Sequence, residues 1–86
     1  MTKLILNISV GEKLKTFRKR KGYTQMQVVR EANLYGSFMS ESTYSKIEQG
    51  TRNIFVSDLI ILKLVLEFSY DELFLDFENS IIQSIK

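Results

Sequence analysis

The sequence predicts an all-α fold of five short helices in a single domain. The first observation is a set of polar residues suited to begin helices, Thr24, Ser40 and Ser69, each followed by apolar residues at helical spacing. The second is a pair of glycines, Gly22 and Gly50, placed where two of these helices should end. The third is the absence of proline, internal repeats and linker-like stretches from the 86 residues, which indicates one small domain.

Residues 1–10 are expected to form a short leader strand. Leu4, Leu6, Ile8 and Val10 alternate with the residues between them, and this period-two pattern is typical of a strand. A lone strand leaves backbone groups unpaired, so it should pair with another strand or with a second subunit. The alternative is a loosely packed leader.

The first two helices are expected on either side of Gly22. The first should span residues 11–21 and the second should begin after its cap, Thr24. The side chains predicted to face the core are Val10, Leu14 and Phe17 for the first helix and Val28, Val29 and Ala32 for the second.

The third helix is expected at residues 40–49 and has two different faces. Ser40 should cap it, with Met39 and Tyr44 placed to form a hydrophobic staple. The opposite side carries only hydrogen-bonding side chains: Glu41, Ser42, Ser45, Lys46 and Gln49. A helix of about two turns is too short to stand alone. Other helices must therefore hold it, which leaves its polar face free to bind something.

Residues 56–67 and 69–86 are expected to form the last two helices. The fourth is apolar nearly all round, apart from Lys63, and a helix without a polar face is normally buried on every side. So small a domain rarely buries a helix completely. The fifth helix carries apolar residues at helical spacing, with an expected break at residues 79–80: Leu73, Phe77, Ile81 and Ile85.

Charge is unevenly distributed along the chain. The net charge is +2, but residues 1–35 hold eight basic and two acidic residues, whereas residues 54–86 hold two basic and six acidic residues. We expect a basic end that faces a polyanion and an acidic end turned away from it. The alternative is that these charges lie on ordinary solvated faces.

Several classes of function are excluded by composition. Without histidine or cysteine, the chain offers no disulfide framework and no His or thiolate metal site, and we expect no metal and no cofactor. It has neither a glycine-rich phosphate loop nor paired carboxylates suited to catalysis, so we expect no enzyme activity and no small-molecule substrate. With neither a long apolar run nor a secretory pattern, a cytoplasmic protein without a membrane partner is expected.

Three motifs occur in the order of a known family. They are Leu14-x-x-x-Arg18-x-x-x-Gly22-x-Thr24-Gln25, then Ser-x-Ser-Thr-x-Ser-Lys-Ile-Glu-x-Gly over residues 40–50, then Ser69-x-Asp71-Glu72-Leu73. Over residues 11–75 the chain resembles the Cro/CI-repressor (Xre-type) helix-turn-helix family. The resemblance implies a lambda-repressor-like fold of five helices. Residues 1–10 would then be a leader or arm and residues 76–86 a C-terminal extension.

The resemblance also implies DNA binding by the third helix. In this family that helix lies in the major groove, above a structural ion pair whose counterpart here is Arg18 with Glu48. The residues expected to read bases are Glu41, Ser42, Ser45 and Lys46. Those expected to hold phosphates are Gln25, Thr24, Thr43, Arg52, Asn53 and Lys19.

One segment departs from the family. Ser40 follows Gln25 by fifteen positions, which is about five more than the usual spacing in the family. In the family the turn between these two helices normally has three or four residues. The extra residues fall within 31–38 and must either lengthen the second helix or enlarge the turn. Val29 also replaces a small residue where the two helices cross, which would tilt the third helix.

The predicted function is a sequence-specific transcription regulator that binds double-stranded DNA. The length fits a repressor of phage, plasmid or toxin–antitoxin type that meets a palindromic operator as a homodimer. The segments expected to dimerise are the leader, pairing across the dyad or covering the tail, and Phe77, Ile81, Ile82 and Ile85. Alternatively, these segments fold back on their own core. The alternative function is a protein-interaction module, an adaptor or anti-repressor, which the acidic Glu41 and the long turn favour.

Overall fold

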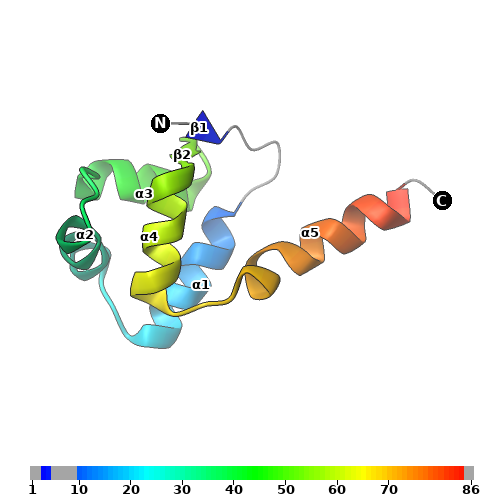
Figure 1. Cartoon of the computed structure of the whole chain (residues 1–86), viewed down its shortest axis with the longest axis horizontal. Coiled ribbons are helices and arrows are strands. Elements are labelled where there is room, and N and C mark those ends of the chain that lie inside the picture. Colours follow the sequence, from blue (N-terminus) through cyan, green and yellow to red (C-terminus); the bar gives the residue numbers. More distant parts are fainter. Residues whose placement is uncertain (1–2, 5–9, 85–86) are drawn as a thin grey trace.

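The computed structural model describes residues 3–4 and 10–84, and five helices dominate it (Figure 1). The prediction of an all-α fold is therefore confirmed. The helices are α1 (Gly11–Lys21), α2 (Gln25–Leu34), α3 (Glu41–Gln49), α4 (Val56–Leu66) and α5 (Tyr70–Ser84), and the strands are β1 (Lys3–Leu4) and β2 (Ile54–Phe55). None of the described helices is long and apolar enough to cross a membrane.

Local interactions explain where the first three helices begin and end. Gly22 and Gly50 adopt left-handed conformations, with φ of 74° and 80°, and close α1 and α3 as predicted. The Thr24 hydroxyl accepts the Gln27 amide at 3.1 Å, and the Gln27 side chain accepts the Thr24 amide at 2.7 Å. Ser40 caps α3 by accepting the Thr43 amide at 3.1 Å.

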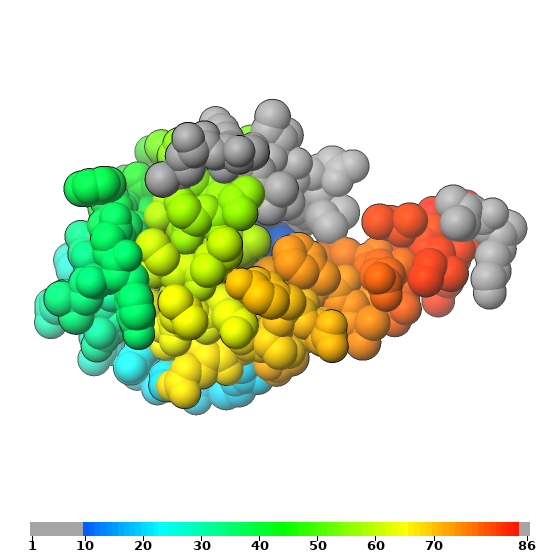
Figure 2. All heavy atoms as spheres, in the orientation of Figure 1, coloured from blue at the N-terminus to red at the C-terminus, as the bar shows by residue number. Residues whose placement is uncertain are grey.

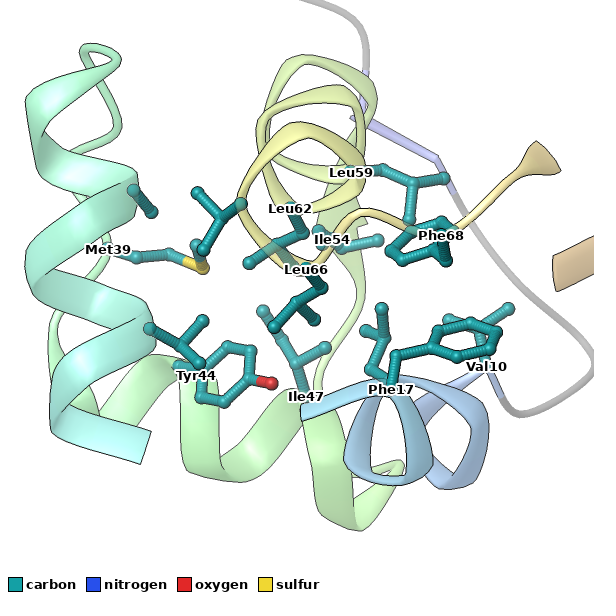
Figure 3. Close-up of a cluster of buried hydrophobic side chains, with 14 of the residues drawn as sticks. Val10, Phe17, Met39, Tyr44, Ile47, Ile54, Leu59, Leu62, Leu66 and Phe68 are labelled. Carbon is teal, nitrogen blue, oxygen red and sulfur yellow. The ribbon is translucent and has the colours of Figure 1, made fainter. Parts of the chain in front are cut away.

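The core lies between α1, α2, α3 and α4 (Figure 3). Side chains from all four helices and β2 converge there, and the side chains predicted to be interior in α1 and α2 are buried. Phe17 stacks on Phe68, with ring centroids 4.5 Å apart, so the segment after α4 also closes the core. The largest side chains with no appreciable exposure are Tyr44, Leu14, Ile54, Leu62, Leu66, Leu73 and Val28.

The leader pairs within its own chain. Lys3 lies opposite Phe55 and Leu4 opposite Ile54, in an antiparallel two-residue ladder. The leader was predicted to pair across a dyad or to cover the tail, but at these two residues the structure shows it paired with β2 of its own chain instead. The predicted strand residues 5–9 lie outside the described part of the chain.

The extra residues between the second and third helices enlarge the turn. After α2, the chain takes six residues, Tyr35–Ser40, to reach the first residue of α3. The turn is anchored at its centre, because the Ser37 hydroxyl donates to Asp58 of α4 at 2.9 Å and accepts the Met39 amide at 3.1 Å. The Asn33 side chain donates to the Met39 carbonyl at 3.2 Å. The turn is long but held in place.

The two C-terminal helices expose more apolar surface than the first three. In α4, Leu59, Leu62, Val65 and Leu66 are buried, but the opposite face is open to solvent: Ile60 and Leu64 are 43% and 47% exposed. The helix is therefore not completely buried, because no element among the described residues covers that face.

α5 leaves the core after its second turn and projects from the body of the molecule (Figures 1 and 2). Ser69 caps it as predicted and accepts the Glu72 amide at 3.0 Å. Leu73 is buried and Phe77 half-buried, whereas the helix from Glu78 to Ser84 is exposed. The predicted break at residues 79–80 is wrong, because asparagine and serine keep their backbone amides and disfavour a helix only weakly.

Candidate nucleic-acid interface

The outer face of α3 is a row of polar side chains open to solvent. Glu41, Ser42 and Lys46 are exposed and Ser45 is half-buried. Neither Glu41 nor Lys46 forms an ion pair within the described ranges, so both charges remain available to a partner. This face has the hydrogen-bonding groups that can contact base edges in a groove.

The inner face of the same helix is fixed by burial and by one carboxylate. Tyr44 and Ile47 enter the core, and Glu48 beside them is buried as well. Glu48 accepts Arg18 Nε at 2.7 Å and Nη2 at 3.1 Å, a bidentate pair whose side chains are 4% and 12% exposed, respectively. Gln25 Nε2 donates to the same carboxylate at 3.1 Å. Glu48 therefore joins α1, α2 and α3.

The charges of this pair are stabilised in the folded protein. Burial alone would raise the pKa of Glu48, but the hydrogen bonds from Arg18 and Gln25 outweigh it and lower that pKa. The hydrogen bonds to Glu48 raise the pKa of Arg18. Burial, and then the neighbouring Glu48, raise the pKa of the Tyr44 hydroxyl, which has no hydrogen-bond partner among the described residues.

Gly11 determines how closely α1 approaches α3, a role that the sequence analysis missed. A Cβ atom on Gly11 would lie 2.4 Å from the carbonyl oxygens of both Ile47 and Glu48. No side chain fits there without moving one backbone away from the other. The sequence did contain an indication of this role: glycine is the first residue of the helix, and the preceding residue, Val10, forms no side-chain cap.

The N-terminus of α2 lies beside α3, through the contact of Gln25 with Glu48. Gln25 is half-buried, and the contact uses one of the two Nε2 hydrogens and orients the amide group, which leaves the second hydrogen to donate to an acceptor such as a phosphate oxygen. Its neighbour Thr24 is exposed, and Lys19 of α1 is exposed with no ion pair in the described residues. The first-turn amides of any helix add partial positive charge at this end.

An open hollow of about 520 Å³ lies between the α2–α3 turn and the start of α4. Its lining includes Phe38 of the turn and Arg52 and Asn53 of the loop after α3. Thr43 also lines it, so this predicted phosphate contact is close to the other two. The remaining lining is mainly apolar: Tyr35, Gly36, Met39, Ile47, Ile54, Phe55, Ser57, Asp58 and Ile61.

The predicted separation of a basic and an acidic end is wrong. Three basic residues of α1 pair with acidic residues of α5 or with the C-cap of α4: Lys13 with Asp76 at 2.7 Å, Arg20 with Glu72 at 2.6 Å, and Lys21 with Glu67, the C-cap. The two charged segments of the sequence therefore neutralise one another along α1. Within residues 10–84, the basic side chains outside any ion pair are Lys15, Lys19, Arg30, Lys46, Arg52 and Lys63.

A short capped helix with a polar outer face, held by two others and preceded by an anchored turn, defines a helix-turn-helix domain. A sequence profile of the family described as "Helix-turn-helix domain" matches residues 9–73, and the chain belongs to this family. The predicted Xre type is confirmed. The fold and the family make the chain a DNA-binding transcription regulator, a class that is generally not enzymatic.

The solved structures include a similar protein. It is a tyrosine-to-phenylalanine mutant of the restriction-modification controller protein C.Esp1396I, in a crystal structure that superposes with a TM-score of 0.67. The two sequences are 26% identical over 86% of this chain and 87% of that chain. A comparison with curated proteins finds no match.

Proposed function

We propose that the protein is a sequence-specific regulator that binds a palindromic operator as a symmetric homodimer, with α3 in the major groove. The observation that carries the proposal is the contrast between the two faces of α3. Glu48 on the inner face ties the helix to α1 and α2, whereas the outer face exposes Glu41 and Lys46, neither of which forms an ion pair among the described residues. Such a helix is rigid where it is held and open where it binds.

Base reading is assigned to the outer face of α3. Lys46 can donate to guanine acceptors, Glu41 can accept from cytosine N4, and Ser42 can do either, with Ser45 close by. The exposure of Lys46 and Glu41 and the lack of a described ion pair for either support this assignment.

Phosphate binding is assigned to side chains that flank α3. At the start of α2, Glu48 holds Gln25 in one orientation, and Thr24 lies beside the first-turn amides. On the other flank, Arg52, Asn53 and Thr43 share one hollow. Together with the exposed Lys19, these residues would set the register of the protein on the duplex.

Dimerisation is assigned to α5. One α3 covers only a few base pairs, whereas two related by a dyad reach half-sites roughly 34–36 Å apart. Phe77 is half-buried, and Ile81 and Ile82 are 60% and 44% exposed on a helix that has left the core. A second copy would cover this surface. Ile85, also assigned to the interface, lies outside the described residues.

A dimer on an operator that overlaps a promoter would act as a repressor, of phage, plasmid or toxin–antitoxin type. The similarity to a restriction-modification controller protein supports a regulatory role and adds a restriction-modification locus as a setting. The second candidate function is a protein-interaction module, an adaptor or anti-repressor. The ion pairs that remove three cations from α1 favour it, together with the acidic Glu41.

Selection of binding sites from random duplex DNA tests the proposal. The wild type should enrich a palindrome, and Lys46→Ala should enrich a different one with a penalty of about 1–3 kcal/mol at one base pair. Gln25→Ala should weaken all duplexes alike, because phosphate contacts carry no sequence information. If the wild type enriches nothing, the interaction-module function is favoured. If Lys46→Ala selects the same motif, the base-reading assignment is wrong.

A further inference from the structure

Phe38, at the tip of the α2–α3 turn, is the most exposed large hydrophobic residue in the described part of the chain. Its relative exposure is 99%, compared with 80% for Leu34 and 57% for Tyr35 in the same region. An apolar ring so exposed contributes nothing to the core of the isolated domain. A phenylalanine at this position becomes favourable only when a binding partner covers it and removes its apolar surface from water.

The backbone on both sides of Phe38 is fixed, so the ring is presented from a rigid base. Its neighbours Ser37 and Met39 are buried at 5% and 6% exposure. The Met39 amide donates to the Ser37 hydroxyl at 3.1 Å, and that hydroxyl donates to Asp58 at 2.9 Å. A rigid aromatic side chain loses little conformational freedom when a partner covers it.

Phe38 lies on the side of the domain that the proposed function turns toward DNA. It precedes Ser40, the N-cap of α3, by two residues, and so stands beside the end of the helix that carries Glu41 and Ser42. It also lines the same hollow as Thr43 and Arg52, which are assigned to phosphates. A duplex held by those residues would pass within reach of the ring.

The apolar group that a major groove offers is the 5-methyl of thymine, and phenylalanine is among the side chains that contact it. Phosphates would favour a polar or cationic side chain at this position, which Phe38 is not. We propose that Phe38 is a specificity-determining residue that covers the 5-methyl of one thymine in each half-site. The inference rests on the proposed function and adds a base contact from outside α3.

Replacement of thymine by deoxyuridine tests this contact directly, because it removes only the methyl group. Each thymine of the selected operator is replaced in turn, and the affinity of the full chain is measured by fluorescence anisotropy. The wild type should bind about fourfold more weakly when the contacted thymine of one half-site is changed, the value of one buried methyl. Phe38→Ala should bind the thymine and deoxyuridine duplexes equally, and both more weakly than the wild type binds thymine.

The controls separate this contact from other effects. Phe38→Ala should melt at the wild-type temperature, because the ring is exposed. Leu34→Ala, a matched exposed apolar position outside the hollow, should keep the wild-type affinity and the wild-type response to deoxyuridine. Unchanged DNA binding by Phe38→Ala would overturn the inference and indicate a protein partner for the ring. An equal loss on every duplex, with the response to deoxyuridine retained, would also overturn it. Failure of the wild type to select any sequence would instead reject the proposed function.

Discussion

Replacement of Arg18 or Glu48 by alanine should destabilise the whole domain, because either change leaves the other charge buried. The two side chains are 12% and 4% exposed and share hydrogen bonds of 2.7 and 3.1 Å. Arg18 also donates to the Tyr23 carbonyl at 2.9 Å, so its removal frees two acceptors at once. Each acceptor would have to be satisfied by water that reaches a poorly accessible site.

The expected loss is about 3–5 kcal/mol of unfolding free energy for either single variant, the range for a buried pair that loses one partner. At roughly 0.05–0.15 kcal/mol per residue, a domain of this size has a total of about 4–13 kcal/mol. The substitution thus removes a large share of the stability. Both alanine variants should have strongly reduced melting temperatures, and a fraction of each should be unfolded at 37 °C.

The contribution of Glu48 to the unfolding free energy should depend on pH in opposite ways in the wild type and in Arg18→Ala. In the wild type the pKa of Glu48 is lowered, since hydrogen bonds from Arg18 and Gln25 outweigh the effect of burial. Its stabilising contribution is therefore complete above the ordinary carboxyl pKa and disappears as the pH falls through the lowered value. Without Arg18, burial dominates and raises the pKa of Glu48, so protonation relieves the damage. The difference in stability should shrink as the pH falls from 7 toward 4.

Urea denaturation followed by circular dichroism at several pH values measures these differences. Arg20→Ala is the matched control, because Arg20 lies on the same helix and pairs with Glu72 at the surface, with side chains 47% and 43% exposed. It should change stability far less than Arg18→Ala. If Arg18→Ala and Arg20→Ala unfolded at the same urea concentration, the buried pair of Arg18 and Glu48 would stabilise the domain no more than a surface pair does.

Three further predictions concern packing, charge and assembly. Gly11→Ala should lower the unfolding free energy by about 1–3 kcal/mol, because the new Cβ overlaps the backbone of α3. Thr16→Ala on the exposed side of α1 should be nearly neutral, and an equal effect of both in urea denaturation would refute the steric argument. Lys19→Ala should reduce the slope of log affinity against log salt concentration by about one, whereas Lys13→Ala, already paired with α5, should not. Equal slopes for these two variants would place Lys19 away from phosphates. Ile81→Asp should sediment as a monomer at micromolar concentration with an unchanged melting temperature, and a persistent dimer would exclude that part of α5 from the interface.

Helix ends could be predicted from the sequence because single residues determine them. Gly22 and Gly50 can adopt a left-handed conformation without strain, and Thr24 and Ser40 can accept an amide of the first turn. These effects act within four residues and need no knowledge of the fold. The same local reasoning failed at residues 79–80, where helix propensity was too weak to end α5.

Contacts between distant residues could be predicted only where a family motif supplied them. The resemblance implied that Arg18 and Glu48 pair, and the structure places them together. No comparable motif joins Lys13 to Asp76, which are 63 positions apart, so charge counts along the chain suggested separation instead of pairing. The close approach at Gly11 depends on the path of a second backbone, so a glycine at the start of a helix marks the position without showing which backbone approaches it.

The ion pairs that α1 forms with α5 and with the end of α4 also affect how fast a duplex is captured. At a distance, DNA responds to the summed field of the protein, and a charge neutralised by a partner a few ångströms away contributes little to that field. With Lys13, Arg20 and Lys21 paired, long-range attraction depends on fewer cations than the basic first half of the chain would suggest. Encounter with DNA should therefore be only moderately accelerated at low salt. Most of the discrimination between operator and other DNA then lies in how slowly the bound protein dissociates, once short-range contacts have formed.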